Sequence, residues 1–213
     1  MERDAFLRRV RTAAAAGRLP ESSETITPVE EVPDLVGTFV ASTRAVDGEV
    51  HDGDPIEVLR GVVERHGPGA HLSWDRRFLP VPGAADVLAG AGPRLDHTVP
   101  SDGRGAHQAE YRVARYGLTG AEAGFAQSGT VVVRSGVGRP RLASLVPEVH
   151  VVLLPKDRIF GSLTGWSRTE AEGMAGAANV VFVTGPSRTG DIEQVLTLGV
   201  HGPRHLHVVL VER

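Results

Sequence analysis

Residues 150–154 read HVVLL, residues 180–184 read VVFVT and residues 205–211 read HLHVVLV. These runs are apolar at consecutive positions, whereas a strand with one face in water alternates apolar and polar residues. Residues 111–116 and 129–134 are strand-like as well. Consecutive apolar positions are typical of strands buried on both faces. The sequence therefore predicts an α/β fold, with a central, mainly parallel sheet flanked by helices.

Segments with helical spacing of apolar residues separate the strands. Leu35, Val36 and Phe39 lie on one apolar stripe of the first such segment. Ile56 and Leu59 lie on the apolar stripe of the second. The segments that we expect to be helical are 28–44, 55–66, 84–89, 119–126, 167–176 and 190–199. Shorter strands are expected at 49–51, at 70–74 and near Leu95.

The first 28 residues differ from the rest of the chain. Phe6, Leu7 and Val10 are spaced as in a helix, and residues 18–28 contain almost no apolar side chains. We therefore expect an N-terminal helix and linker over 1–28 and one α/β domain over 29–213.

Composition excludes several kinds of chemistry. The chain has 213 residues, 41% hydrophobic and 23% charged, which is typical of a globular protein. It has no cysteine, which excludes disulfides, thiolate nucleophiles and cysteine-held zinc or iron–sulfur clusters. A net charge of −3 favours neither nucleic acid nor an anionic membrane as a partner. Without an apolar leader or a run long enough to cross a bilayer, we expect a cytoplasmic protein.

The loop after the strand at 180–184 has a composition suited to anion binding. The N-terminus of a helix near 190 would attract an anion, and a guanidinium group binds one in a bidentate fashion. The alternative is that Asp191 only caps the helix and that Arg188 pairs with a surface carboxylate. The candidate ligand-binding residues are Ser187, Arg188, Thr189 and Gly190.

A second loop, residues 116–133, contains a candidate catalytic carboxylate. Glu122 is placed to act as a nucleophile or general base. It also stands three positions after Thr119, so a capping box explains it equally well. Gly129 and Thr130 suit a close approach of the backbone to a ligand, although a turn before a strand has the same composition.

Histidines gather near the C-terminus. His205 and His207 lie on one face of the expected strand, and His201 is nearby. Two histidines on one face can ligate a metal. Because no third ligand is fixed, hydrogen-bonded or surface histidines are the favoured interpretation, and we expect no metal or cofactor on this chain.

Three segments resemble the LUD-domain family. They are GLTGAEAGFAQSGTVVV at 117–133, RPRLASLVPEVHVVLLP at 139–155 and VTGPSRTGDIEQVLTLGVHGPRHLHVVLV at 183–211. Two positions depart from the family pattern: Gln127-Ser128 replaces an acidic pair, and Gly190 stands where alanine is common. The resemblance therefore gives no support for an acidic role at residue 127.

The resemblance implies a fold similar to the sugar-phosphate isomerase and CoA-transferase group. It also implies a role in oxidising L-lactate to pyruvate, within a three-protein system whose partners carry iron–sulfur clusters. This chain would then be a cluster-free subunit that binds a small carboxylate or phosphate, with His201 near the ligand. One alternative is an independent CoA-transferase- or isomerase-like enzyme that uses Glu122. Another is an interaction module that docks through residues 1–28.

Overall fold

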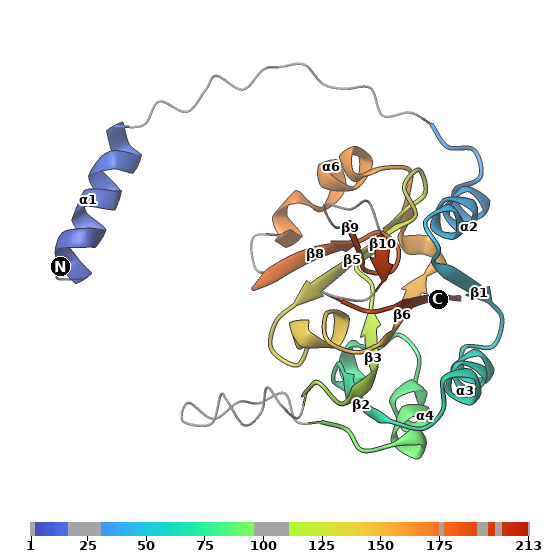
Figure 1. The fold of residues 1–213 in the computed structure, drawn as a ribbon. Coiled ribbons are helices and arrows are strands. Elements are labelled where there is room, and N and C mark those ends of the chain that lie inside the picture. The colour runs from blue at the N-terminus through green and yellow to red at the C-terminus, as the bar shows by residue number, and fades with distance from the viewer. Residues whose placement is uncertain are drawn as a thin grey trace.

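A five-stranded sheet forms the centre of the protein in the computed structural model (Figure 1). The structure describes residues 3–16, 31–95, 111–174, 177–190, 196–198 and 202–212. The strand order is β1–β11–β6–β3–β2, and each neighbouring pair is parallel. This arrangement confirms the predicted α/β fold with a parallel central sheet. The strands are β1 (Glu49–Asp52), β2 (Ala70–Ser73), β3 (Ala114–Gly120), β6 (Val149–Pro155) and β11 (His205–Val211).

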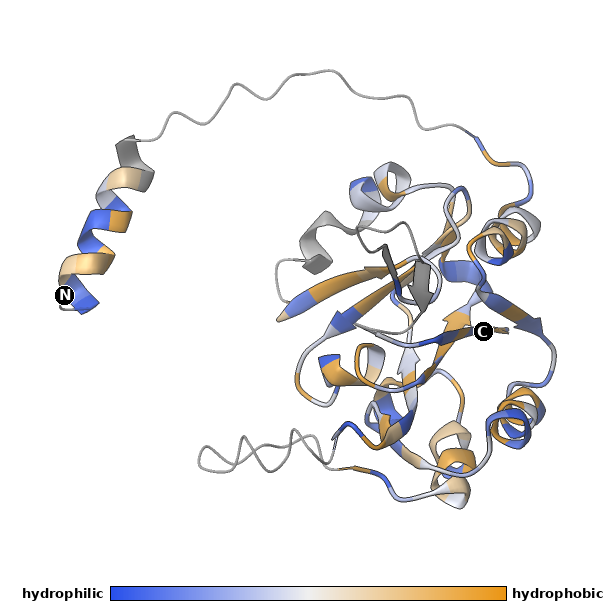
Figure 2. Ribbon diagram, in the orientation of Figure 1, coloured by the Kyte–Doolittle hydropathy of each residue, from blue (hydrophilic) through white to orange (hydrophobic). Residues whose placement is uncertain are grey.

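The two middle strands carry the apolar runs that predicted the fold. In β6, the six residues from Val149 to Leu154 are buried, and in β11 the six from Leu206 to Val211 are buried. Burial on both faces explains why neither strand alternates in polarity. Figure 2 shows hydrophobic residues along many of the strands.

Two of the helices that cover this sheet begin with a side-chain cap. The Asp34 carboxylate accepts a hydrogen bond from the Gly37 N–H, and Asp54 accepts from the N–H groups of Ile56 and Glu57. Such caps satisfy backbone donors that the first helical turn leaves unpaired. The helices are α1 (Arg3–Ala16), α2 (Leu35–Ala45), α3 (Pro55–His66), α4 (Ala84–Ala91) and α6 (Leu163–Met174), with short 3₁₀ turns at Arg76–Phe78, Arg141–Ser144 and Lys156–Arg158.

A second sheet packs against the first, which the sequence did not predict. Its strand order is β7–β4–β5–β8, with antiparallel pairing on both sides of β5. Gly124 of β4 lies between Leu154 of β6 and Phe39 of α2, and a Cβ at position 124 would come within 2.8 Å of the leucine. An alanine at this position would therefore require the Leu154 side chain to shift. The strands are β4 (Ala123–Phe125), β5 (Thr130–Ser135), β7 (Ile159–Phe160) and β8 (Asn179–Val183).

Two expected helices are strands in the structure. Over 119–126 the backbone continues β3 and enters β4, and the Ala121 and Glu122 N–H groups donate to carbonyls of Leu153 and Val132. The capping box was therefore wrong, because sheet pairing takes the donors that a helix needs. Near 190, β9 (Arg188–Gly190) pairs antiparallel with β10 (Leu196–Leu198). The helix N-terminus expected there was also wrong.

The predicted N-terminal helix is present as α1, and in Figure 1 it lies apart from the two sheets. Phe6 and Val10 are about half-exposed. The linker expected before residue 28 lies outside the described residues, so the division at that point stays a prediction. Within the described ranges, none of the helices is long and apolar enough to cross a membrane.

Candidate functional site

The structure brings both predicted ligand loops to the C-terminal end of α2. Gly129 has a φ of +63°, and its carbonyl accepts a 3.4 Å hydrogen bond from the Thr43 hydroxyl. Next to it, the Thr130 hydroxyl oxygen lies 2.7 Å from that of Ser128 and 2.8 Å from that of Thr184. This row of three hydroxyls links the turn before β5 to the end of β8.

Arg188 is already engaged by a carboxylate. Its guanidinium group forms an ion pair with Asp47, just before β1. Asp47 has a φ of +61°, a left-handed conformation that is uncommon outside glycine and occurs at functional sites more often than elsewhere. This contact is the alternative that the sequence left open for Arg188, so ligand binding by Arg188 stays a prediction.

Other residues of the predicted loop are placed in part. The Ser187 N–H donates a 2.8 Å hydrogen bond to the Pro203 carbonyl. Thr189 and Gly190 lie in β9, and His201 lies outside the described residues. The loop from Ser187 therefore runs beside the segment that leads into β11.

Glu122 lies away from these residues. Its carboxylate oxygen Oε2 is 3.3 Å from Arg134 Nε and 3.9 Å from Arg139 Nη1. Arg158 Nε donates a 2.9 Å hydrogen bond to the Glu122 carbonyl. Glu122 precedes β4 at one end of the β4–β5 hairpin, whereas Thr130 begins β5 at the other end. These contacts give Glu122 a structural role, and a catalytic role stays a prediction.

A basic cavity of about 450 Å³ opens at the amino ends of β3, β6 and β11. Its charged lining is Arg112, Arg115 and Arg204 with a single carboxylate, Glu148. Arg115 donates to the His66 carbonyl. Neither Arg112 nor Arg204 forms an ion pair with any of the described residues. The excess of guanidinium groups makes the cavity suitable for a small anion.

The cavity adjoins the predicted loop. Gly202 contributes to the cavity wall, and a Cβ at that position would lie 3.1 Å from Ser187 Cβ. Sequence reasoning missed the three arginines because no motif links them. They come together only through the parallel pairing of β3, β6 and β11, which places the starts of these strands at one edge of the sheet.

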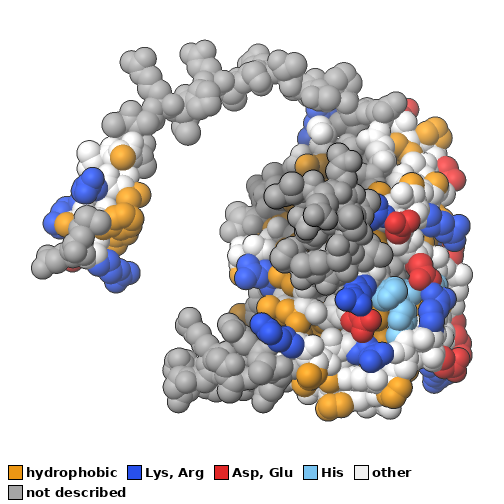
Figure 3. Space-filling model, in the orientation of Figure 1, with side chains coloured by type: hydrophobic (Ala, Val, Ile, Leu, Met, Phe, Trp, Pro, Cys, Tyr) orange, Lys and Arg blue, Asp and Glu red, His pale blue; other side chains and the backbone are white. Residues whose placement is uncertain are grey.

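Histidines form a cluster at the same edge, on the side covered by α3 (Figure 3). The rings of His207 and His205 both contact His66, and their centroids lie 5.2 and 4.6 Å from the centroid of the His66 ring. The shared strand face predicted for His205 and His207 is therefore confirmed. His51 Nε2 lies 3.0 Å from His207 Nδ1. Burial lowers the pKa of His207 to about 4, and it also lowers the pKa values of His51 and His66.

The chain is similar to proteins of one family. Residues 92–211 match the family model described as the LUD domain. Lactate utilization protein C of Geobacillus sp. (strain WCH70) is 31% identical over 165 residues, which are 74% of this chain and 68% of that protein. A protein of the same name from Exiguobacterium sp. (strain ATCC BAA-1283 / AT1b) is 38% identical over 102 residues, 46% of this chain and 44% of the relative.

A solved structure has a similar fold. It is the crystal structure of a DUF162 family protein from Deinococcus radiodurans, with a TM-score of 0.60 and 18% sequence identity. The match covers 83% of this chain and 96% of that one. At this identity the similarity shows the fold alone.

Proposed function

This chain belongs to the LUD domain family, and we propose that it is a component of a system that oxidises L-lactate to pyruvate. Relatives that are 31% and 38% identical carry the name lactate utilization protein C, which supports involvement in lactate utilization. The sequence contains no cysteine. Cysteine-held iron–sulfur clusters that take the electrons would therefore reside on partner proteins in the cytoplasm.

The contribution proposed for this chain is to bind a small carboxylate in the basic cavity. The observation that supports this site best is the set of three guanidinium groups around one cavity, two of them without an ion-pair partner among the described residues. A guanidinium group matches a carboxylate with two parallel hydrogen bonds. The cavity volume of about 450 Å³ is within the range of small-molecule sites.

Arg188, which the sequence predicts to bind the ligand, is the competing candidate for the anion site. Its side chain is 36% exposed and that of Asp47 is 72% exposed. An exposed ion pair contributes only about 0–1 kcal/mol. An anionic ligand that displaced Asp47 would therefore lose little free energy of interaction. Arg188 and the cavity residue Arg204 must both be tested.

Isothermal titration calorimetry of the full chain with L-lactate, pyruvate and inorganic phosphate separates the two sites. We expect Arg204→Ala to weaken carboxylate binding roughly 10- to 150-fold, because a charge-assisted hydrogen bond contributes about 1.5–3 kcal/mol. Arg60→Ala is the matched control, because Arg60 forms an exposed ion pair with Glu57 on α3, outside the basic cavity. This control should bind like the wild type.

The outcomes show which of the two sites binds the anion. Weaker binding by Arg188→Ala with unchanged binding by Arg204→Ala would move the anion to the predicted loop and overturn the cavity assignment. The absence of carboxylate binding to the wild type would overturn both sites.

The role in lactate oxidation needs a separate assay. Extracts that contain this chain together with cysteine-rich iron–sulfur partners should reduce an electron acceptor when L-lactate is added. Extracts that lack only this chain should not. Equal activity without the chain would contradict the proposed role.

A further inference from the structure

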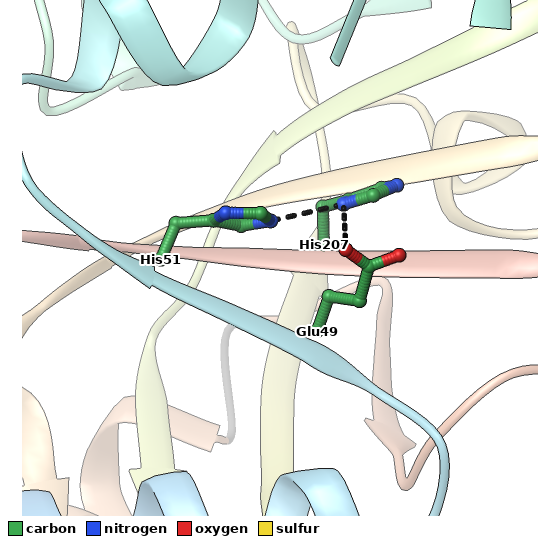
Figure 4. Close-up of side chains that lie close together, drawn as sticks. All are labelled: Glu49, His51 and His207. Atoms are coloured by element: carbon green, nitrogen blue, oxygen red, sulfur yellow. Dashed lines mark hydrogen bonds and ion pairs between the residues drawn. The ribbon is translucent and has the colours of Figure 1, made fainter. Parts of the chain in front are cut away.

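Three potential metal ligands meet where β1 pairs with β11. Glu49 lies directly opposite His207 in the parallel register, and His51 follows two residues after Glu49 on the same face of β1. Their side chains point toward one another (Figure 4). One ligand atom from each residue lies within 4.8 Å of the other two. We propose that Glu49, His51 and His207 bind a divalent transition-metal ion, with Zn²⁺ as the ion that fits best.

Two of the three separations between ligand atoms are close to those of a tetrahedral site. His51 Nε2 lies 3.0 Å from His207 Nδ1, and His207 Nδ1 lies 3.8 Å from Glu49 Oε2. Two ligand atoms that each bind Zn²⁺ at about 2.0–2.1 Å in a tetrahedron are about 3.3 Å apart. Shifts of a few tenths of an ångström therefore bring these two pairs to the spacing that zinc requires.

The surroundings of the three ligands resemble an outer shell. A histidine that binds a metal through one ring nitrogen usually donates the N–H of the other nitrogen to a neighbour. His207 Nε2 lies 3.1 Å from His66 Nε2, so the second nitrogen has such a partner. Arg65 Nη1 donates a 2.5 Å hydrogen bond to Glu49 Oε2, which fixes the carboxylate. The His207 side chain is fully buried, so its orientation is set by packing.

Position and ligand type favour one class of ion. Two imidazole nitrogens with one carboxylate suit zinc and similar transition metals, whereas Mg²⁺ and Ca²⁺ prefer oxygen ligands. His66 is the last residue of α3, so the cluster lies at the C-terminal end of that helix. The partial negative charge there favours a cation and offsets part of the repulsion from Arg65. The Glu49 side chain is 43% exposed, which leaves solvent access for a water as the fourth ligand.

Zinc binding to the full-length, tag-free and metal-free chain tests the proposal. The readout is competition with a chromophoric chelator, and Co²⁺ replaces Zn²⁺ to report coordination through its visible absorption. We expect the wild type to bind the ion at this site with a tetrahedral Co²⁺ spectrum. We expect Glu49→Gln and His51→Gln to weaken binding by more than the roughly 10–100-fold that outer-shell changes cost.

The matched control is His205→Asn, which removes a partly exposed histidine from the same strand face but leaves the three ligands in place. It should keep zinc affinity within a few-fold of the wild type. Circular dichroism of the metal-free variants identifies any loss of fold, and both ligand variants change partly exposed side chains. Wild-type zinc affinity in Glu49→Gln and His51→Gln would overturn the proposal, as would equal loss in His205→Asn.

Discussion

Buried histidines of the central sheet make the stability of this protein depend on pH, and two of them, His150 and His71, lie outside the histidine cluster. His150 in β6 is fully buried, and burial lowers its pKa to about 3. His71 in β2 is 1% exposed, and burial lowers its pKa to about 4. In the unfolded chain both histidines titrate near pH 6.5. Between these values the unfolded state takes up protons that the folded state does not, so lowering the pH favours unfolding.

The size of the effect follows from the width of this interval. Each histidine reduces the free energy of unfolding by about 1.4 kcal/mol per pH unit once the pH is well below 6.5. From pH 7 to pH 5 the loss is about 2 kcal/mol for each residue, or about 4 kcal/mol for the two. Well above pH 6.5 the contribution is fully present, because the histidines are neutral in both the folded and the unfolded state. The loss is a large part of the 5–15 kcal/mol that typically stabilises a folded protein.

Urea unfolding at pH 7 and pH 5, followed by circular dichroism, measures this loss. His150→Gln is the matched variant, because an amide keeps a hydrogen-bonding partner for the Thr119 hydroxyl, which lies 2.9 Å from His150 Nε2. Its own stability at pH 7 does not matter, because the quantity compared is the change between the two pH values. We expect this change to be about 2 kcal/mol smaller than in the wild type. Equal changes in both proteins would refute the reasoning.

Further substitutions test the packing of the two sheets and the role of Glu122. Gly129→Ala should lower the free energy of unfolding, measured by thermal melting, by about 2–4 kcal/mol. The alanine would have to keep a left-handed φ, and its Cβ would lie 2.4 Å from a backbone atom. Gly61→Ala in α3 is the control, because a Cβ there meets nothing within 4 Å, and this variant should be neutral or stabilising in the same measurement. Thr119→Val should cost about 1–3 kcal/mol in urea unfolding, because it leaves the buried His150 without its partner. Glu122→Gln should leave carboxylate binding unchanged in calorimetry, and a covalent glutamyl adduct with an acyl-CoA in the wild type would contradict the structural role of Glu122.

The central sheet could be predicted because its strands carry their own signal. The apolar run at 150–154 is buried in β6, and residues 206–211 of the second run are buried in β11, as consecutive apolar residues indicate. The segment 119–126 failed for the opposite reason. Its Thr119 and Glu122 have the spacing of a capping box, and local spacing contains no information on Leu153 and Val132, whose carbonyls take the backbone donors. Pairing across distant strands overrides a local helix signal.

The candidate sites show the same limit. The pairing of His205 and His207 on one face follows from strand periodicity within one segment. Their partners Glu49 and His51 lie more than 150 residues earlier and reach them only through the register of β1 and β11. Likewise, Arg112 and Arg204 share a cavity because β3 and β11 both border β6. Spacing along the sequence gives no sign of either group.

The most direct test of the central claim is a crystal structure of the full chain grown with pyruvate. We predict that the pyruvate carboxylate lies within hydrogen-bond distance of the Arg204 guanidinium group, inside the basic cavity at the amino ends of β3, β6 and β11. Pyruvate bound at Arg188 or at Glu122, with the cavity holding only water, would contradict the account.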